Sequence, residues 1–193
     1  GTTSDDVAYG AAVDSSNNVY VTGTTYGGMD NNSNFGSADI FLVKYNSSGA
    51  KQWTNQWGTS YEDVAYAITH SSSNVYLTGY TKGNLNSESN SHTGSADVFI
   101  INDYDNSTYR NTVLLGGGTN NAEKGRSISV DSSNNVYVTG DNNTTDGDND
   151  AFLTKFNSSL SVQWTDNITS DNTTASYADY GYGVVVNSDG YIY

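Results

Sequence analysis

The sequence has no cysteine and no proline among its 193 residues. Without cysteine, the chain can form no disulfide bond and has no thiol to serve as a nucleophile or a metal ligand. The absence of proline suits a chain whose backbone N–H groups are mostly committed to β-ladders. Hydrophobic residues are also scarce, at 35%, and they come in short alternating runs between clusters of Asn, Ser, Thr and Gly. This pattern predicts short β-strands separated by polar turns, with no helical period.

Positive charge is scarce as well. The chain has 7 Lys and Arg residues against 21 Asp and Glu residues, which gives a net charge of −14. A surface this acidic repels the phosphates of nucleic acids and anionic lipids, so nucleic acid is not an expected partner. No apolar run approaches the roughly 18 residues needed to cross a bilayer, so membrane insertion is not expected either.

An internal repeat organises the chain. A pentapeptide of the form Val-Tyr-Val/Leu-Thr-Gly occurs at 19–23, 75–79 and 136–140, with offsets of 56 and 61 residues. A second marker, Asp-x-Phe, keeps step with the first and opens at Asp39, Asp97 and Asp150. Trp53 and Trp164 each follow the Asp of their unit by 14 residues. Markers that stay in phase over this period indicate a repeat architecture.

Each unit contains four predicted strands separated by turn-forming residues. In the first unit these strands are Val7–Val13, Asn18–Thr22, Ile40–Tyr45 and Lys51–Trp57. Four strands per unit at this period predict an all-β fold, a β-propeller made of four-stranded antiparallel blades. The first strand of each unit is expected to be innermost and to line the channel, as in Val7–Val13 and Ser127–Val130.

The quoted motifs resemble a known family. The run Asp-Ser-Ser-Asn-Asn-Val-Tyr-Val-Thr-Gly at 14–23 and 131–140, followed by Asp-x-Phe-x-x-Lys-Tyr/Phe and a Trp, is similar to the bacterial SBBP repeat of "seven-bladed" β-propellers. The resemblance implies a propeller module in exported or cell-surface bacterial proteins, and therefore an extracellular or cell-surface location. It implies no particular activity, because propellers host many functions. The second unit departs from the motif, with His70 at the turn Asp, Asn102 at the Lys and Asn111 at the Trp.

The number of units predicts a single, incomplete propeller segment over residues 1–193. About three and a half blades are expected, with units at about 4–59, 60–118, 119–171 and a truncated 172–193. Propellers close with about four to eight blades. The chain is therefore expected to belong to a longer propeller, and its open edge is a candidate surface for self-association.

Repeated and clustered carboxylates suggest two different roles. The Asp that opens the third strand of every unit is expected to cap a turn, because each unit has that turn. The run 146–150 places Asp146, Asp148 and Asp150 at alternate positions, where carboxylate oxygens can converge on Ca²⁺. Calcium is the one candidate cofactor of the chain, and an acidic solvent loop is the alternative interpretation.

The loops between the second and third strands suggest a ligand-binding face. They contain 15, 17 and 9 residues, at 24–38, 80–96 and 141–149, and they should emerge on the same face as the connections between units. Variable loops on one face of a repeat array commonly form its binding face. The candidate ligand-binding residues are Tyr26, Met29, Phe35, Tyr61, Tyr80 and His92. Tyr among Asn, Ser and Gly is typical of recognition loops, although unselected solvent loops are the alternative.

Three functions remain open from the sequence. The favoured one is a non-catalytic interaction or scaffold module that binds a protein or a glycan, with no catalytic residues assigned. The second is a polysaccharide-acting enzyme that uses paired carboxylates, for which Glu62, Asp63 and Glu123 are the candidates. The third is a purely structural spacer.

Overall fold

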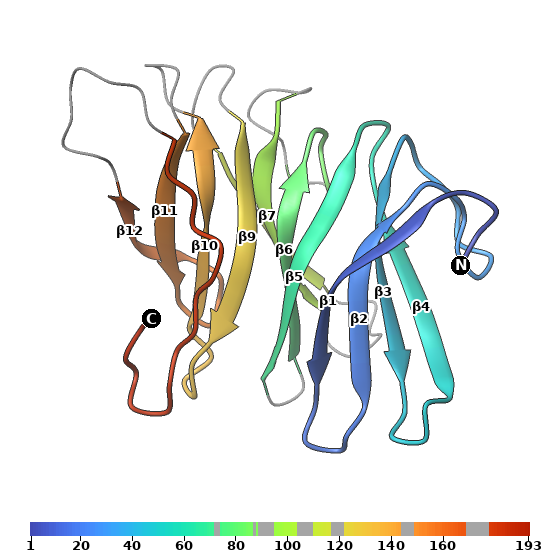
Figure 1. The fold of residues 1–193 in the computed structure, drawn as a ribbon, viewed down its shortest axis with the longest axis horizontal. Coiled ribbons are helices and arrows are strands. Elements are labelled where there is room, and N and C mark those ends of the chain that lie inside the picture. Colours follow the sequence, from blue (N-terminus) through green and yellow to red (C-terminus); the bar gives the residue numbers. More distant parts are fainter. Residues whose placement is uncertain are drawn as a thin grey trace.

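The computed structural model describes residues 1–71, 74–86, 88, 95–103, 110–116, 122–143, 149–168 and 178–193. All regular secondary structure in these residues is β-strand, which confirms the all-β prediction. The strands form three four-stranded antiparallel sheets, each within one predicted repeat unit, and Figure 1 shows the sheets side by side. The first sheet contains β1 (Asp6–Val13), β2 (Val19–Thr25), β3 (Asp39–Tyr45) and β4 (Lys51–Trp57). The second contains β5 (Asp63–Ser71), β6 (Asn74–Thr81), β7 (Asp97–Asp103) and β8 (Arg110–Leu115). The third contains β9 (Glu123–Val130), β10 (Val136–Asn143), β11 (Asn149–Phe156) and β12 (Val162–Ile168).

The second sheet is covered on both faces because side chains alternate along its strands. In β7, Phe99 and Ile101 pack with residues of the first sheet, whereas Val98 and Ile100 pack with residues of the third. Every residue of β7 is buried, in agreement with this arrangement. We call the interface between the first and second sheets the first seam, and the interface between the second and third sheets the second seam.

Three positions of the repeated pentapeptide, the Tyr, the Thr and the Gly, have the same structural role in every unit. The Tyr is buried in all three units, as Tyr20, Tyr76 and Tyr137. The Thr donates its hydroxyl to a Phe carbonyl of the neighbouring strand, as Thr22 does to Phe41 at 2.7 Å. The equivalent hydroxyls of Thr78 and Thr139 donate to Phe99 and Phe152 at 2.8 and 2.6 Å. The Thr therefore joins the second and third strands of every sheet.

The Gly of the pentapeptide makes room for a β-bulge in the first strand of each sheet. A Cβ on Gly23, Gly79 or Gly140 would lie 1.8–1.9 Å from a carbonyl oxygen of that strand. The register shifts at the same place in β1, β5 and β9, so that one residue of each strand has no partner in the ladder. These extra residues are Tyr9, Tyr66 and Arg126.

The register corrects the sequence alignment of the second unit by one residue. His70 pairs with Val75, as Val13 pairs with Val19, so His70 occupies the position of Val13 and not that of the turn Asp. Ser71 takes the Asp position, because the turn of this unit is one residue shorter. The assignments of Asn102 and Asn111 are confirmed, since they pair with each other as Lys44 pairs with Trp53.

The same backbone contact joins each unit to the next. The N–H of Asp63 donates to Ala38 O at 2.8 Å, and the N–H of Glu123 donates to Ala96 O at 2.7 Å. Asp179 makes the equivalent contact with Asn149 O at 2.6 Å. Residues 178–193 therefore continue the pattern beyond the third sheet, and in Figure 1 they run alongside β9 and β10.

Candidate functional site

The long β2–β3 loop and the β4–β5 connection emerge at the same end of the first sheet, as the sequence predicted. We call it the Asp end, because the carboxylates that begin β1 and β3 lie there. Asp39 accepts the N–H of Phe35 at 2.8 Å from the loop, and Gly36 packs directly against the backbone of Thr59 in the connection. Asp39 therefore organises a turn, as expected for the Asp of the third strand.

The six predicted ligand-binding residues divide into exposed and buried groups. Tyr26, Phe35 and Tyr61 are exposed at the Asp end. Met29 is buried, because its loop folds back so that its N–H donates to Gln56 Oε1 and its side chain covers Phe41 and Val43. Tyr80 is buried too, and His92 lies outside the described residues.

Tyr80 belongs to a strand and not to the predicted loop. β6 extends through Thr81 because it pairs with β5 along its whole length, up to the Asp63–Thr81 pair. The Tyr80 ring packs with Val64 and Ala96, and this burial raises the pKa of the Tyr80 hydroxyl. Tyr80 therefore cannot contact a ligand as an exposed loop residue would.

The bulges of the first strands create a row of large side chains that crosses the sheets. We call Tyr9, Tyr66, Arg126 and Tyr182 the bulge row. Tyr182 lies in no strand and at no bulge, but it extends the row, since it lies against Arg126 and follows Gly181, whose N–H donates to Gly140 O. The rings of Tyr9 and Tyr66 meet edge to face, with centroids 5.3 Å apart. Tyr9 and Tyr182 are 50% and 71% exposed, so both ends of the row are open to solvent.

Arg126 joins the third sheet to the C-terminal segment. Its guanidinium lies 5.4 Å from the ring centre of Tyr180 and 5.2 Å from that of Tyr182. Its Nε forms an ion pair with Asp141, which fixes the guanidinium over the rings. Burial opposes the charge of Arg126, but hydrogen bonding to Asp141 raises its pKa overall. Arginine and tyrosine are among the residue types enriched at the centres of binding interfaces.

A second group of cations lies beside the bulge row. Lys124 places its Nζ 5.1 Å from the ring centre of Tyr80, and Lys82 approaches the same ring at 5.8 Å. Lys82 also forms an ion pair with Glu62 at 2.6 Å, and this contact lowers the pKa of Glu62. Together with Arg126, three of the seven basic residues of an acidic chain are thus gathered around Tyr66 and Tyr80.

The three carboxylates of the enzyme hypothesis occupy different settings. Asp63 is fully buried and accepts hydrogen bonds from Thr59 N at 2.6 Å, from Thr59 Oγ1 at 2.9 Å and from the Thr81 hydroxyl. Burial raises the pKa of Asp63 to about 6, and the charge of Asp39 adds to the effect. Glu62 is paired with Lys82. Glu123 lies on the second seam, where it lines a hollow that neither Glu62 nor Asp63 lines.

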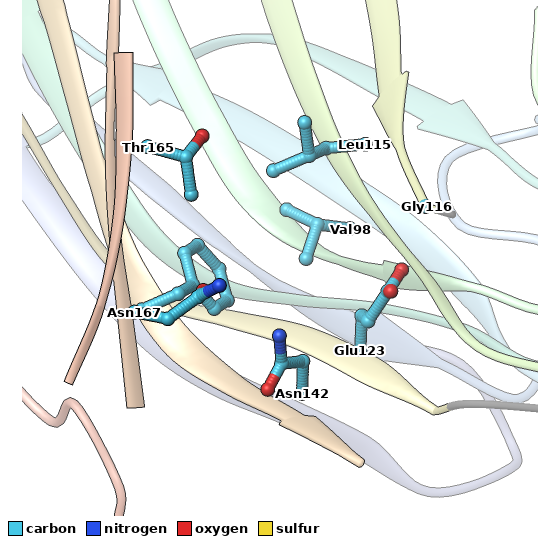
Figure 2. Close-up of a pocket in the computed structure, with 8 residues that line it drawn as sticks. Val98, Leu115, Gly116, Glu123, Asn142, Thr165 and Asn167 are labelled. Carbon is cyan, nitrogen blue, oxygen red and sulfur yellow. The ribbon is translucent and has the colours of Figure 1, made fainter. Parts of the chain in front are cut away.

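That hollow has a volume of about 240 Å³ and lies between the second and third sheets. Figure 2 shows Glu123 and Asn142 on one side of it, Val98 and Leu115 on another, and Thr165 and Asn167 on β12. Its walls combine apolar side chains with a carboxylate and two amides. No sequence pattern indicates this hollow, because it depends on which side chains face each other across the second seam.

The predicted calcium ligands are mostly beyond the described part of the chain. Asp146 and Asp148 lie outside the described residues, whereas Asp150 lies in β11 and pairs with Asn142. Among the described residues there is no group of three or more His, Asp or Glu side chains that could hold a metal. The calcium site therefore stays a prediction.

No protein-family model matches the chain, and no curated protein is significantly similar to it. In the described part of the chain, no helix is long and apolar enough to cross a membrane.

The bulge row does not stand out in the sequence, although a signal for it exists. Its members occupy the third position of the runs at 7–10, 64–67, 124–127 and 180–183, each of which has a small residue on both sides of it. Aligned on these runs, the large side chain recurs once per unit. The pentapeptide dominates the sequence alignment and hides this weaker repeat.

Proposed function

We propose that the three sheets are blades of a β-propeller of the SBBP type, with residues 178–193 beginning a further blade. The repeated contact from Asp63, Glu123 and Asp179 to the preceding unit supports this proposal. The contacts between neighbouring sheets also support it, because β5 packs on the first sheet and β9 packs on the second. Such units bury their faces against neighbours, as propeller blades do.

We propose that the chain is a non-catalytic interaction module of an exported or cell-surface protein, and that it binds a glycan or a protein. The bulge row is the single observation that carries this proposal. It places exposed tyrosines at both ends of the row and an arginine fixed by Asp141 between them in sequence, and these residue types contribute most to binding surfaces. The exposed residues Tyr26, Phe35 and Tyr61 extend the candidate surface at the Asp end.

The settings of the carboxylates favour binding over hydrolysis. Glycoside hydrolysis requires two carboxyl groups that face each other across a cleft, roughly 5–10 Å apart. Asp63 is buried with its oxygens hydrogen-bonded, and Glu62 is engaged by Lys82. A polysaccharide-acting enzyme remains the second hypothesis, and a structural spacer remains the third.

Binding to an array of glycans and to bacterial and host surface proteins tests the proposed function, together with a hydrolysis screen. We expect binding without turnover, and we expect Tyr9→Ala to weaken it by about 1–2 kcal/mol, as the loss of an exposed aromatic contact does. Tyr191→Ala is the matched control, because Tyr191 is also exposed but lies outside the bulge row. Product release from a polysaccharide would replace this proposal with the enzyme hypothesis.

If the folded chain bound none of the glycans or proteins tested, this result would instead favour the hypothesis of a structural spacer. Self-association through an open propeller edge stays a prediction, and sedimentation over a range of concentrations tests it. An array signal that Tyr9→Ala and Tyr191→Ala leave equally unchanged would place the binding surface elsewhere, with the loop residues Tyr26 and Tyr61 next to be tested.

A further inference from the structure

The two seams differ at one pair of equivalent positions. Trp57 pairs with Ile40 at the end of the first sheet, and Leu115 pairs with Val98 at the same place in the second. Trp57 is only 5% exposed and belongs to the core of the first seam. The smaller Leu115 lines the hollow of about 240 Å³ in the second seam. The hollow is therefore the space that an indole fills one unit earlier.

The polar groups of the two seams differ in the same region. In the first seam, Asp63 pairs with Thr81, and its oxygens accept hydrogen bonds from Thr59 and Thr81. In the second seam, the equivalent pair is Glu123 with Asn142, so a longer carboxylate faces an amide in place of a hydroxyl. The Oδ1 atom of Asn142 is buried and accepts no hydrogen bond within the described residues. A buried acceptor of this kind is costly unless another molecule satisfies it.

The walls of the hollow have the two surfaces that a sugar ring requires. Val98, Leu115 and Phe152 offer apolar contact to the C–H face of a ring. Glu123 accepts hydrogen bonds, while the amides of Asn142 and Asn167 both donate and accept, and Figure 2 shows the amide nitrogens of these two residues directed inward from different strands. Hydroxyl groups match such a mixed set, because each is a donor and an acceptor.

We infer that the hollow in the second seam binds a single neutral sugar ring, such as one residue of a glycan. Its volume is below the roughly 300–1,000 Å³ of sites for drug-sized ligands, which limits the occupant to one ring. The carboxylate of Glu123 and the net charge of −14 act against an anionic sugar. This inference rests on the proposed function and deepens it, because it names the ligand class and a second contact point.

Titration of the chain with single sugars, followed by NMR or calorimetry, tests the inference. The probes are D-glucose, D-galactose, N-acetyl-D-glucosamine and D-glucuronate, with indole as an apolar ring of similar size. We expect at least one neutral sugar to bind, and we expect the anionic D-glucuronate to bind at least about tenfold more weakly. Binding of indole without any sugar, or of no probe at all, would overturn the inference.

Two variants locate the binding. Leu115→Trp fills the hollow with the side chain of the first seam, and we expect it to weaken sugar binding at least about tenfold while raising the melting temperature. Asn142→Thr introduces the residue at the equivalent position of the first seam, and we expect the same loss of binding. Unchanged sugar affinity in a folded form of either variant would place the sugar elsewhere and contradict the inference.

Trp57→Leu is the matched control. It removes the indole from the first seam, where Asp63 already accepts hydrogen bonds from Thr59 and Thr81, so we expect a lower melting temperature and no new sugar site. A new sugar site in this variant would show that an apolar hollow is sufficient and would contradict the role assigned to Asn142. The proposed function fails separately, because Tyr9→Ala alters the bulge row without touching the second seam.

Discussion

At the scale of single residues, the recurring side chains have two kinds of role. Some join strands within a sheet, as Thr22 does, or pack between sheets, as Tyr20 does, and they recur because every unit makes the same contacts. Others, such as Gly79 and Asp63, allow one strand to approach another or fix the start of the next sheet. Repetition alone therefore does not identify a functional residue in this chain.

A substitution at Gly79 tests whether the close approach of β5 and β6 at the bulge requires glycine. A Cβ there would lie 1.8 Å from Val64 O and 2.9 Å from Ala65 Cα, both backbone atoms that cannot move freely. We expect Gly79→Ala to lower the free energy of unfolding by about 1–3 kcal/mol or more, measured by chemical denaturation. Gly183→Ala is the control, because nothing lies within 4 Å of the position that its added methyl group would take, and its stability should be unchanged.

The raised pKa of Asp63 predicts how the free energy of unfolding depends on pH. Its pKa is about 6 in the folded chain, against an ordinary value of 3.8, because the carboxyl is buried. The folded state binds this proton more tightly than the unfolded state, so the added stability is complete below pH 3.8 and is lost as the pH rises through about 6. The shift corresponds to about 3 kcal/mol, and burial raises the pKa of Asp39 in the same direction.

Asp63→Asn isolates this contribution. The amide can accept from Thr59 and donate to Thr81, so the hydrogen bonds are kept without the buried charge. Between pH 5 and 8, denaturation curves should show a smaller fall in stability for the variant than for the parent. Equal slopes for the two proteins would mean that Asp63 does not carry the pH dependence.

At the scale of elements, turns set the register of neighbouring strands, and strand pairing decides which side chains lie on each face of a sheet. Asp131 accepts the N–H groups of Ser133 and Asn135 at 2.9 and 2.8 Å, and the Tyr137 hydroxyl at 3.2 Å. Burial opposes its ionisation, but these hydrogen bonds lower its pKa overall. Asp14 makes the same contacts in the first unit. The β9–β10 turn is therefore held by one carboxylate.

Asp131→Ala should remove several of these hydrogen bonds at once. We expect a loss of about 1–3 kcal/mol of stability, with the binding of any ligand at the bulge row retained, since the turn lies at the other end of β9. The exposed Asp189 provides the control, because Asn187 and not Asp189 accepts the N–H groups of its turn. A loss of the same size from Asp189→Ala would show that surface charge, and not the turn, is responsible.

At the scale of the whole molecule, the chain is an acidic stack of sheets with several of its few cations gathered near the bulge row. The carboxylates that give the chain its net charge of −14 repel one another. At 0.1 M, salt screens this repulsion beyond about 10 Å. The outer strand β12 is exposed along its length, whereas β7 is buried on both faces. The second sheet therefore forms the centre of the described structure.

Salt should stabilise the chain as a whole. At pH 7 we expect the melting temperature to rise between about 20 mM and 500 mM NaCl, because screening weakens repulsion among the carboxylates. Near the pI of about 4.1 the net charge vanishes, and the same change in salt should have little effect. A melting temperature that falls with salt at pH 7 would show that the ion pairs of Lys82 and Arg126 outweigh the general repulsion.

Strand identity and strand boundaries follow largely from local chemistry. The predicted strand Lys51–Trp57 matches β4 residue for residue, because alternating side chains and an Asn-Ser-Ser-Gly turn define it locally. β2 and β6 run further than predicted, to Thr25 and Thr81, because pairing with β1 and β5 extends them into polar sequence. The alignment of His70 with the turn Asp is wrong because a turn shorter by one residue is visible only in the register.

The recurring pentapeptide, the four strands of each sheet and the turn roles of Asp14, Asp39 and Asp131 can be predicted from the sequence, since these features depend on neighbours along the chain. The burial of Met29 and Tyr80, the contact between Tyr9 and Tyr66 at the bulges, and the hollow beside Leu115 could not be predicted from the sequence. These features depend on which side chains meet across a seam. Residues from separate units meet there only when the sheets pack, and the spacing along one chain does not encode that contact.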